Sequence, residues 1–138
     1  MAFEHQTTVL FSQVDAVGIA FFGRAFEMCH EALEAMLVAG GLPLNVILDG
    51  GDWAMPLVHA SADFKRPMKL GDRITIRMEL AEQSGGSLTF AYALLGDSGD
   101  LRANVKLVHA FIDRKRFKGR RAPEQALEAF QRAGLTLP

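Results

Sequence analysis

The spacing of apolar residues divides the chain into segments with two different periods. Between Phe21 and Leu37, apolar residues recur every three or four positions while charged residues take the opposite side, which predicts a largely buried amphipathic helix. Gly40, Gly41 and Pro43 end this helix, because glycine favours the C-terminal turn and proline cannot continue a helix. Elsewhere the chain follows mainly a period of two.

That second period predicts five strands, at residues 3–12, 56–64, 73–80, 87–95 and 101–113. Short turns containing glycine join most of the later strands, which favours antiparallel pairing. One apolar helix against one antiparallel sheet is an α+β architecture, and a short amphipathic helix at about residues 123–133 closes the chain. The far face of the sheet carries charged residues such as Arg73, Arg77 and Glu79, so it is either solvated or covered by another subunit.

Composition places the chain among folded globular proteins. It has 138 residues, 49% of them hydrophobic, and a net charge of −1, so we expect one domain, 1–138, with no general attraction to nucleic acid or membrane. No apolar run approaches the ~18 residues of a membrane span, and the N-terminus lacks the features of a signal peptide. Cys29, the single cysteine, allows no internal disulfide. We expect it to be a buried small hydrophobe in a cytoplasmic protein.

One carboxylate, Asp15, stands in a short loop just before the long helix. The simplest interpretation is that it stabilises a turn or the positive end of the helix. The functional interpretation rests on position, because a carboxylate beside a helix N-terminus lies close to unpaired backbone N–H groups, here those near Phe22 and Gly23. A base or nucleophile beside an oxyanion site is what acyl transfer requires. Phe21 and Phe22 would exclude water from such a pocket, although phenylalanines at a helix start are also typical of a core.

The histidines do not form a recognisable catalytic or metal motif. His59, Ser61 and Asp63 are expected on one face of a strand together with Leu57, but residues two apart lie ~7 Å from each other, too far for direct side-chain hydrogen bonds. A polar face at a subunit interface is the simpler interpretation, with His59 lining a site. His30 points away from its acidic neighbour on the helix, and four scattered histidines with one cysteine do not predict a zinc site.

A basic run, RKRFKGRR at residues 114–121, contains six of the fifteen basic residues. Such a run is usually a solvated charged surface. The functional alternative is an anion site, either for nucleic acid or for the phosphates of a nucleotide-bearing substrate. One short cluster with a single aromatic residue, in a chain close to neutral, is weak support for nucleic acid.

The segment DAVGIAFFGRAFEMCHEA, residues 15–32, resembles the signature loop and helix of hot-dog-fold acyl-CoA thioesterases of the 4-hydroxybenzoyl-CoA thioesterase type. The resemblance extends over about residues 4–113, and the order of the predicted elements agrees with it. Residues 51–74, GDWAMPLVHASADFKRPMKLGDRI, are more similar to the 1,4-dihydroxy-2-naphthoyl-CoA hydrolases of menaquinone and phylloquinone biosynthesis than to the hydroxybenzoyl type.

This resemblance implies one long central helix wrapped by a five-stranded antiparallel sheet, and hydrolysis of an aromatic acyl-CoA. It implies Asp15 as the catalytic residue and the backbone N–H groups of Phe22 and Gly23 as the oxyanion hole. Asp15 either attacks the thioester carbonyl to give a mixed anhydride or activates a water molecule, and the sequence leaves both open. We assign Phe21, His30 and His59 to the substrate pocket.

The resemblance also implies a homodimer or homotetramer with the site at a subunit interface, and no metal or redox cofactor. The basic run then becomes a candidate site for coenzyme A phosphates, on the same or a neighbouring subunit, through Arg114, Lys115, Arg116 and Lys118. The first choice of substrate is 1,4-dihydroxy-2-naphthoyl-CoA. The alternatives are a broader-range thioesterase for short-chain or hydroxybenzoyl-type acyl-CoAs, and a non-catalytic module that binds acyl-CoA or nucleic acid.

Overall fold

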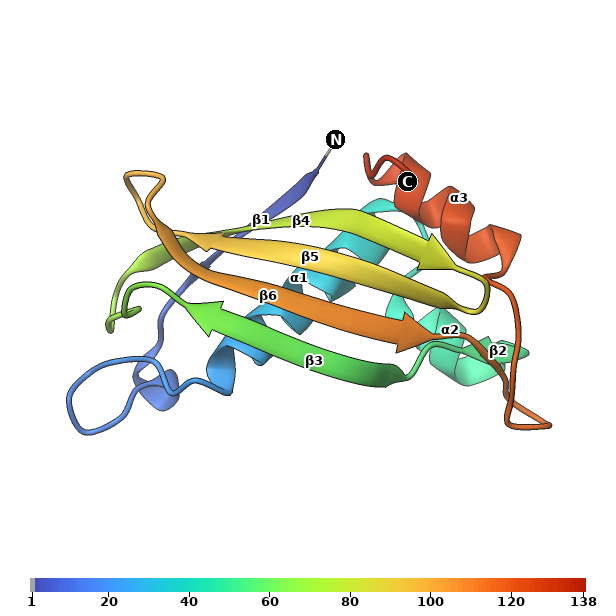
Figure 1. The fold of residues 1–138 in the computed structure, drawn as a ribbon, viewed down its shortest axis with the longest axis horizontal. Coiled ribbons are helices and arrows are strands. Elements are labelled where there is room, and N and C mark those ends of the chain that lie inside the picture. Colours follow the sequence, from blue (N-terminus) through green and yellow to red (C-terminus); the bar gives the residue numbers. More distant parts are fainter. Residues whose placement is uncertain (1) are drawn as a thin grey trace.

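The computed structural model describes residues 2–138, and its largest element is a five-stranded antiparallel sheet (Figure 1). The strands lie in the order β1–β4–β5–β6–β3, with β1 (Phe3–Thr8), β3 (Leu57–Phe64), β4 (Arg73–Ser84), β5 (Ser87–Leu95) and β6 (Leu101–Ala110). Strand alternation decides which face each side chain takes. On β4, Ile74 and Met78 are buried while Arg77 and Glu79 are exposed. The predicted α+β class is confirmed, and these charged residues of the far face are exposed in the protomer.

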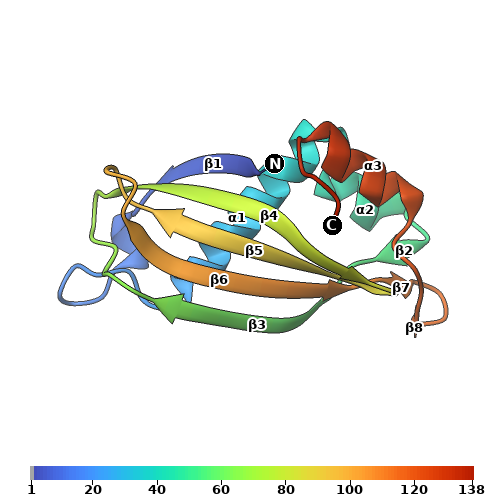
Figure 2. The same ribbon diagram turned by 45° about the horizontal axis from the view of Figure 1, so that its top comes forward.

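Helix α1 (Arg24–Ala39) covers one face of this sheet (Figures 1 and 2). It begins at Arg24, later than the apolar period suggests, because Arg24 N donates to Phe21 O (2.8 Å) and closes a turn there. It ends at Gly40 as predicted, and Gly41 follows with a φ of +77°, which glycine adopts without strain. Seven side chains at helical spacing are buried against the sheet: Ala25, Met28, Cys29, Ala32, Leu33, Met36 and Leu37.

Shorter elements complete the fold. Helix α3 (Glu124–Arg132) agrees with the prediction, and its Phe130 ring packs edge-on against Phe90 with the ring centroids 5.6 Å apart. The spacing of apolar residues does not predict the remaining elements, because segments of two to seven residues are too short to show a clear periodicity. They are a 3₁₀ turn (Phe11–Gln13), helix α2 (Leu44–Gly50), and a small sheet of β2 (Trp53–Ala54), β7 (Ile112–Asp113) and β8 (Lys118–Gly119).

The two loops that carry candidate site residues lie at opposite ends of the large sheet. Residues 13–21, which precede α1, form the blue loop at one end, and the β7–β8 hairpin projects from the other (Figures 1 and 2). Strand β6 has ten residues and alone spans about 33 Å between these ends. Candidate site residues that belong to different loops are therefore far apart within one protomer.

No single helix within residues 2–138 is long and apolar enough to cross a bilayer. Only α1 and α2 taken together reach the required length and composition, and they are bent by 83° at the break between them.

Candidate active site

Asp15 lies in a tight loop that precedes α1. Its Oδ1 accepts hydrogen bonds from the backbone N–H groups of Val17 (2.9 Å) and Ile19 (3.3 Å), and Gly18 between them has a φ of +78°. The turn-stabilising role expected of an aspartate is therefore present. Within residues 2–138 no group donates to the other oxygen, Oδ2, and the residue is exposed. One carboxylate oxygen holds the loop while the other is available for chemistry.

The start of α1 supplies two unpaired backbone donors. The N–H groups of Arg24 and Ala25 donate to the carbonyl oxygens of Phe21 (2.8 Å) and Phe22 (3.2 Å). Among the residues that the structure describes, no group accepts from the N–H of Phe22 or of Gly23. The rings of Phe21 and Phe22 lie against each other with centroids 4.6 Å apart, and both side chains are exposed in the protomer. A carbonyl oxygen placed here would find two donors beside an aromatic surface.

Residues 67–72, which precede β4, support the Asp15 loop from the side. The N–H of Ala20 donates to Met68 O (2.7 Å), and the N–H of Leu70 donates to Gly18 O (2.9 Å). The second half of the loop is thus tied by backbone hydrogen bonds to a segment distant in sequence. The position of Asp15 depends on how firmly that segment is held.

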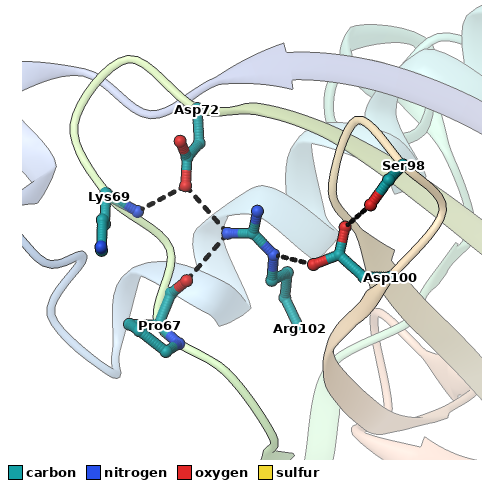
Figure 3. A network of polar contacts seen from close by, with 6 residues as sticks. All are labelled: Pro67, Lys69, Asp72, Ser98, Asp100 and Arg102. Atoms are coloured by element: carbon teal, nitrogen blue, oxygen red, sulfur yellow. Dashed lines mark hydrogen bonds and ion pairs between the residues drawn. The ribbon is translucent and has the colours of Figure 1, made fainter.

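Arg102 on β6 holds this segment (Figure 3). Its Nη1 donates to Pro67 O (2.8 Å) and Asp72 Oδ2 (2.8 Å), and its Nε donates to Asp100 Oδ2 (2.6 Å). Ser98 Oγ donates to the other oxygen of Asp100 (2.7 Å). Only 16% of the Arg102 side chain is exposed, so its hydrogen bonds are partly shielded from water. Arg102 is not evident from the sequence, because its partners Asp100, Asp72 and Pro67 lie 2, 30 and 35 residues away.

We expect the variant Arg102→Met to melt at a lower temperature than the wild type at neutral pH, by roughly 2–8 °C, the change that about 1 kcal/mol causes in domains of this size. The hydrogen bond from Arg102 is the main cause that holds the pKa of Asp72 below its usual range. Hydrogen bonds from Ser98 and then Arg102 lower the pKa of Asp100 to about 2. In the unfolded chain these groups titrate near ~3.9.

Because both carboxylates have the lower pKa in the folded state, their contribution to stability is complete above about pH 4 and is lost as the pH falls toward about 2. The difference in melting temperature between wild type and variant should therefore shrink over this window, as thermal unfolding at several pH values would show. Arg132→Met removes an exposed arginine bonded to Glu128 (3.4 Å) and is the control that should change little. A difference that stays constant down to about pH 2 would contradict this role for the two carboxylates.

An open groove of about 540 Å³ runs beside α1. His30, which the sequence analysis assigns to the substrate pocket, lies in its wall, and the ring of His109 from β6 lies 6.0 Å from that of His30. His109 is not among the residues assigned from the sequence, although a signal for it is present. It occupies the buried side of β6 in an alternation that otherwise places Ala103, Val105 and Leu107 there. The rest of the lining consists of four apolar residues, Leu33, Leu44, Met55 and Leu57, and three glutamates, Glu27, Glu31 and Glu34.

His59 lies on the opposite face of the sheet from this groove. The pairing of β3 with β6 shifts register between Leu57 and His59, so Leu57 pairs with buried His109 while His59 pairs with Val108. Directly paired residues project to the same face. The expectation that Leu57 and His59 share a face is therefore wrong, because a bulge interrupts the period of two. One protomer does not bring His59 and His30 together.

The basic run forms the β7–β8 hairpin, at the end of the sheet remote from Asp15. Arg114 already has partners, since its Nη1 donates to Ile47 O (3.2 Å) and Leu48 O (2.7 Å) near the end of α2. Asp113 Oδ1 accepts from the N–H groups of Arg116 and Lys115, which lowers the pKa of Asp113. The side chains of Lys115, Arg116 and Lys118 are exposed. Within one protomer the run and Asp15 do not meet.

Two further basic residues lie next to the start of α1. Lys65 and Arg66, at the end of β3, line a hollow of about 300 Å³ together with Phe22 and Phe64. Both basic residues are exposed. The sequence contains this pair as Phe-Lys-Arg-Pro, but two adjacent charges are too common at strand ends to indicate a site without their position in the fold.

Cys29 is fully buried on α1, and burial raises the pKa of its thiol, as expected for a small core residue. Within residues 2–138 no three or more histidine, cysteine, aspartate or glutamate side chains are grouped to hold a metal ion.

Comparison with known proteins gives consistent results. Residues 9–130 match the family model described as the thioesterase-like superfamily. The 1,4-dihydroxy-2-naphthoyl-CoA hydrolase of Synechocystis sp. is 33% identical over 111 residues, which is 80% of each chain. That of Rippkaea orientalis is 32% identical over 112 residues, covering 80% of this chain and 81% of the relative. The crystal structure of a 1,4-dihydroxy-2-naphthoyl-CoA thioesterase from Synechocystis superposes with a TM-score of 0.88 at 30% identity, covering 95% and 96% of the two chains.

Proposed function

Since the chain belongs to the thioesterase-like superfamily and has its hot-dog fold, we propose that it hydrolyses an aromatic acyl-CoA, with 1,4-dihydroxy-2-naphthoyl-CoA as the first choice. The names of the relatives that it resembles over most of its length support this substrate. The observation that carries the activity is the combination, in one loop and the helix after it, of an unbonded carboxylate oxygen and two unpaired N–H donors. A cytoplasmic location remains a prediction, in line with a single cysteine that forms no disulfide.

The reaction places charge where this site can stabilise it. The thioester carbonyl oxygen accepts from the N–H groups of Phe22 and Gly23, and the positive end of α1 adds to the stabilisation as the oxygen becomes negative. In one route Asp15 Oδ2 attacks the carbonyl carbon, the C–S bond breaks, and water hydrolyses the resulting mixed anhydride. In the other, Asp15 takes a proton from a water molecule that attacks directly. Both routes release the acid and the thiol of coenzyme A.

Thiol release from a panel of acyl-CoAs tests this proposal. The panel contains 1,4-dihydroxy-2-naphthoyl-CoA, 4-hydroxybenzoyl-CoA, benzoyl-CoA and short-chain acyl-CoAs. We expect the highest kcat/KM for the dihydroxynaphthoyl thioester. Similar values across the panel would indicate a broad-range thioesterase, and binding without thiol release from any member would indicate a non-catalytic module.

We predict a homodimer or a larger assembly built on it, joined through β3. This strand is at the edge of the sheet, and all of its residues except Ala62 are exposed, including Val58 and Phe64. An open edge with apolar side chains invites pairing with a second chain, and a second β3 would continue the sheet with two-fold symmetry. Ala60→Lys would place a charge in the middle of this edge in both copies.

Light scattering and sedimentation at micromolar concentration measure the outcome. The wild type should be a dimer or tetramer, and Ala60→Lys should shift it toward the monomer. The control Gln6→Lys places the same charge on β1, at the other edge, and should leave the assembly unchanged. A wild type that is a stable, active monomer would contradict the prediction.

We also predict that the basic run binds the phosphates of coenzyme A. Because the run lies far from Asp15 within one protomer, it would serve the active site of a neighbouring subunit. Changing Lys115, Arg116 and Lys118 to glutamine should raise KM for the acyl-CoA by about tenfold, because three charges that bind the phosphates are lost. A tenfold change corresponds to about 1.4 kcal/mol of binding free energy. The change in kcat should be smaller, because phosphate contacts act alike in ground and transition states. The increase should diminish at high salt.

Lys65→Gln with Arg66→Gln is the second arm of this experiment, because that pair lies beside Phe22 in the same protomer. A pantetheine thioester of the same acid lacks the nucleotide and should respond to neither set of changes. If only the Lys65 and Arg66 variant raises KM, the phosphates bind near the start of α1 and the run is a solvated surface.

A further inference from the structure

One buried side-chain nitrogen in the wall of the groove beside α1 lacks a hydrogen-bond partner. Among residues 2–138, two buried polar side-chain atoms lack a partner, Tyr92 Oη and His109 Nε2. Tyr92 is buried in the core, although the residue also lines a separate hollow of about 270 Å³ with Ser61 and Asp63. His109 lines the groove, although only 4% of the residue is exposed. Buried polar atoms are nearly always paired, so an unpaired one at the edge of a groove indicates a missing partner.

The other nitrogen of this ring determines what that partner must be. His109 Nδ1 lies 2.8 Å from Met55 O, and a carbonyl oxygen only accepts, so Nδ1 carries the proton. Burial is the main cause that lowers the pKa of His109, which keeps the ring neutral. Nε2 is therefore an unprotonated acceptor with its lone pair directed away from Met55. The missing partner must donate a hydrogen bond, as a hydroxyl group does.

The groove lies along α1 from Glu27, one turn beyond Gly23, and His109 is in its wall. Gly23 has helical backbone angles, so Glu27, His30 and Glu34, which follow it by four, seven and eleven positions, share one face of the helix. Glu27, His30 and Glu34 line the groove. The rise of the helix puts His30 about 10 Å along the axis from Gly23. An acyl group whose carbonyl oxygen is bound at Gly23 can therefore extend its ring along this face toward His30 and His109.

We propose that His109 recognises a hydroxyl group on the aromatic ring of the acyl substrate, by accepting its hydrogen bond at Nε2. This inference rests on the proposed function and adds a specificity-determining residue to it. His30 lies 6.0 Å away, ring to ring, and is exposed, so a rotation of its side chain would widen the approach to His109. The apolar walls contact the ring, and Nε2 selects for the hydroxyl.

The rim of the groove fits a neutral ligand. Glu27, Glu31 and Glu34 line it. Two of these carboxylates have partners, Arg24 for Glu27 (2.7 Å) and His5 for Glu31 (3.1 Å). Negative side chains at the rim disfavour an anion, so the thioester with a neutral hydroxyl is favoured over a ring that carries an additional carboxylate.

Kinetics with a matched pair of substrates test the assignment. 4-Hydroxy-2-naphthoyl-CoA and 2-naphthoyl-CoA differ only in the hydroxyl, and the wild type should favour the hydroxylated thioester in kcat/KM by roughly 2- to 12-fold, the range of one neutral hydrogen bond. His109→Phe keeps an aromatic ring without the acceptor and should abolish or reverse this preference. Leu33→Met, an apolar change in the same wall, should alter both substrates alike. A preference that survives in His109→Phe, or no preference in the wild type, would overturn the assignment.

Binding of neutral methyl esters separates this inference from the proposed activity. Calorimetry with methyl 4-hydroxy-2-naphthoate and methyl 2-naphthoate should show the same preference without any need for turnover. In the wild type the ¹⁵N resonance of His109 Nε2 should move only with the hydroxylated ester, which settles the question even if His109→Phe fails to fold. If no acyl-CoA is hydrolysed but this resonance moves, the proposed activity fails and the hydroxyl site remains. If thiol is released but the resonance does not move, the proposed activity remains and the hydroxyl site is wrong.

Discussion

Replacing Asp15 with asparagine is expected to lower kcat for thioester hydrolysis by about 10²-fold or more, the size of a general-base contribution. The structure makes this substitution unusually informative. Asp15 uses Oδ1 to accept from Val17 and Ile19, and the amide oxygen of asparagine preserves both hydrogen bonds. What the variant loses is the negative charge and the nucleophilic or basic Oδ2.

The same substitution therefore distinguishes a catalytic aspartate from a turn residue. If Asp15 only stabilises the loop, Asp15→Asn should keep nearly full activity, and a kcat within about tenfold of the wild type would contradict the catalytic assignment. Asp15→Ala is the structural comparison, because it removes the acceptor as well as the charge. We expect kcat to fall by about 10²-fold or more in both variants, but only Asp15→Ala to have a lower melting temperature. Thiol release and thermal unfolding measure the two effects separately.

Phe22→Pro is expected to lower kcat by about 10²- to 10³-fold relative to Phe22→Ala, the effect of removing one oxyanion donor. Proline has no N–H, whereas alanine keeps it, and both lack the phenyl ring. The backbone should tolerate proline here, because Arg24 N donates to Phe21 O (2.8 Å) and places Phe22 second in a four-residue turn. Proline is favoured at that position of a turn.

Comparing the two variants isolates the backbone donor from the ring. Phe22→Ala should alter KM through the loss of the aromatic surface that packs on Phe21. Only Phe22→Pro should lose transition-state stabilisation, which appears as a fall in kcat. Equal kcat values for the two folded variants would show that the Phe22 N–H does not bind the oxyanion, and would leave Gly23 as the remaining donor.

The sequence by itself determined the elements whose signals are local. The period of apolar residues identifies α1, the five long strands and α3, because burial on one face requires that spacing. The helix end at Gly40 is equally local, since it depends on glycine and proline within a few positions. The turn at Asp15 is also local, because Oδ1 accepts from Val17 and Ile19, although the second half of its loop is tied to residues 67–72.

Only the tertiary structure decided which distant residues meet. Arg102 supports the Asp15 loop through Pro67 and Asp72, and no local pattern records a partner 30 residues away. A single bulge in β3 turns His59 to the opposite face from Leu57, because one extra residue reverses the alternation of a strand. The same pairing brings His109 beneath α1 near His30. Local periodicity determines how each segment folds, whereas strand register and packing determine which side chains face one another, and the candidate site depends on both.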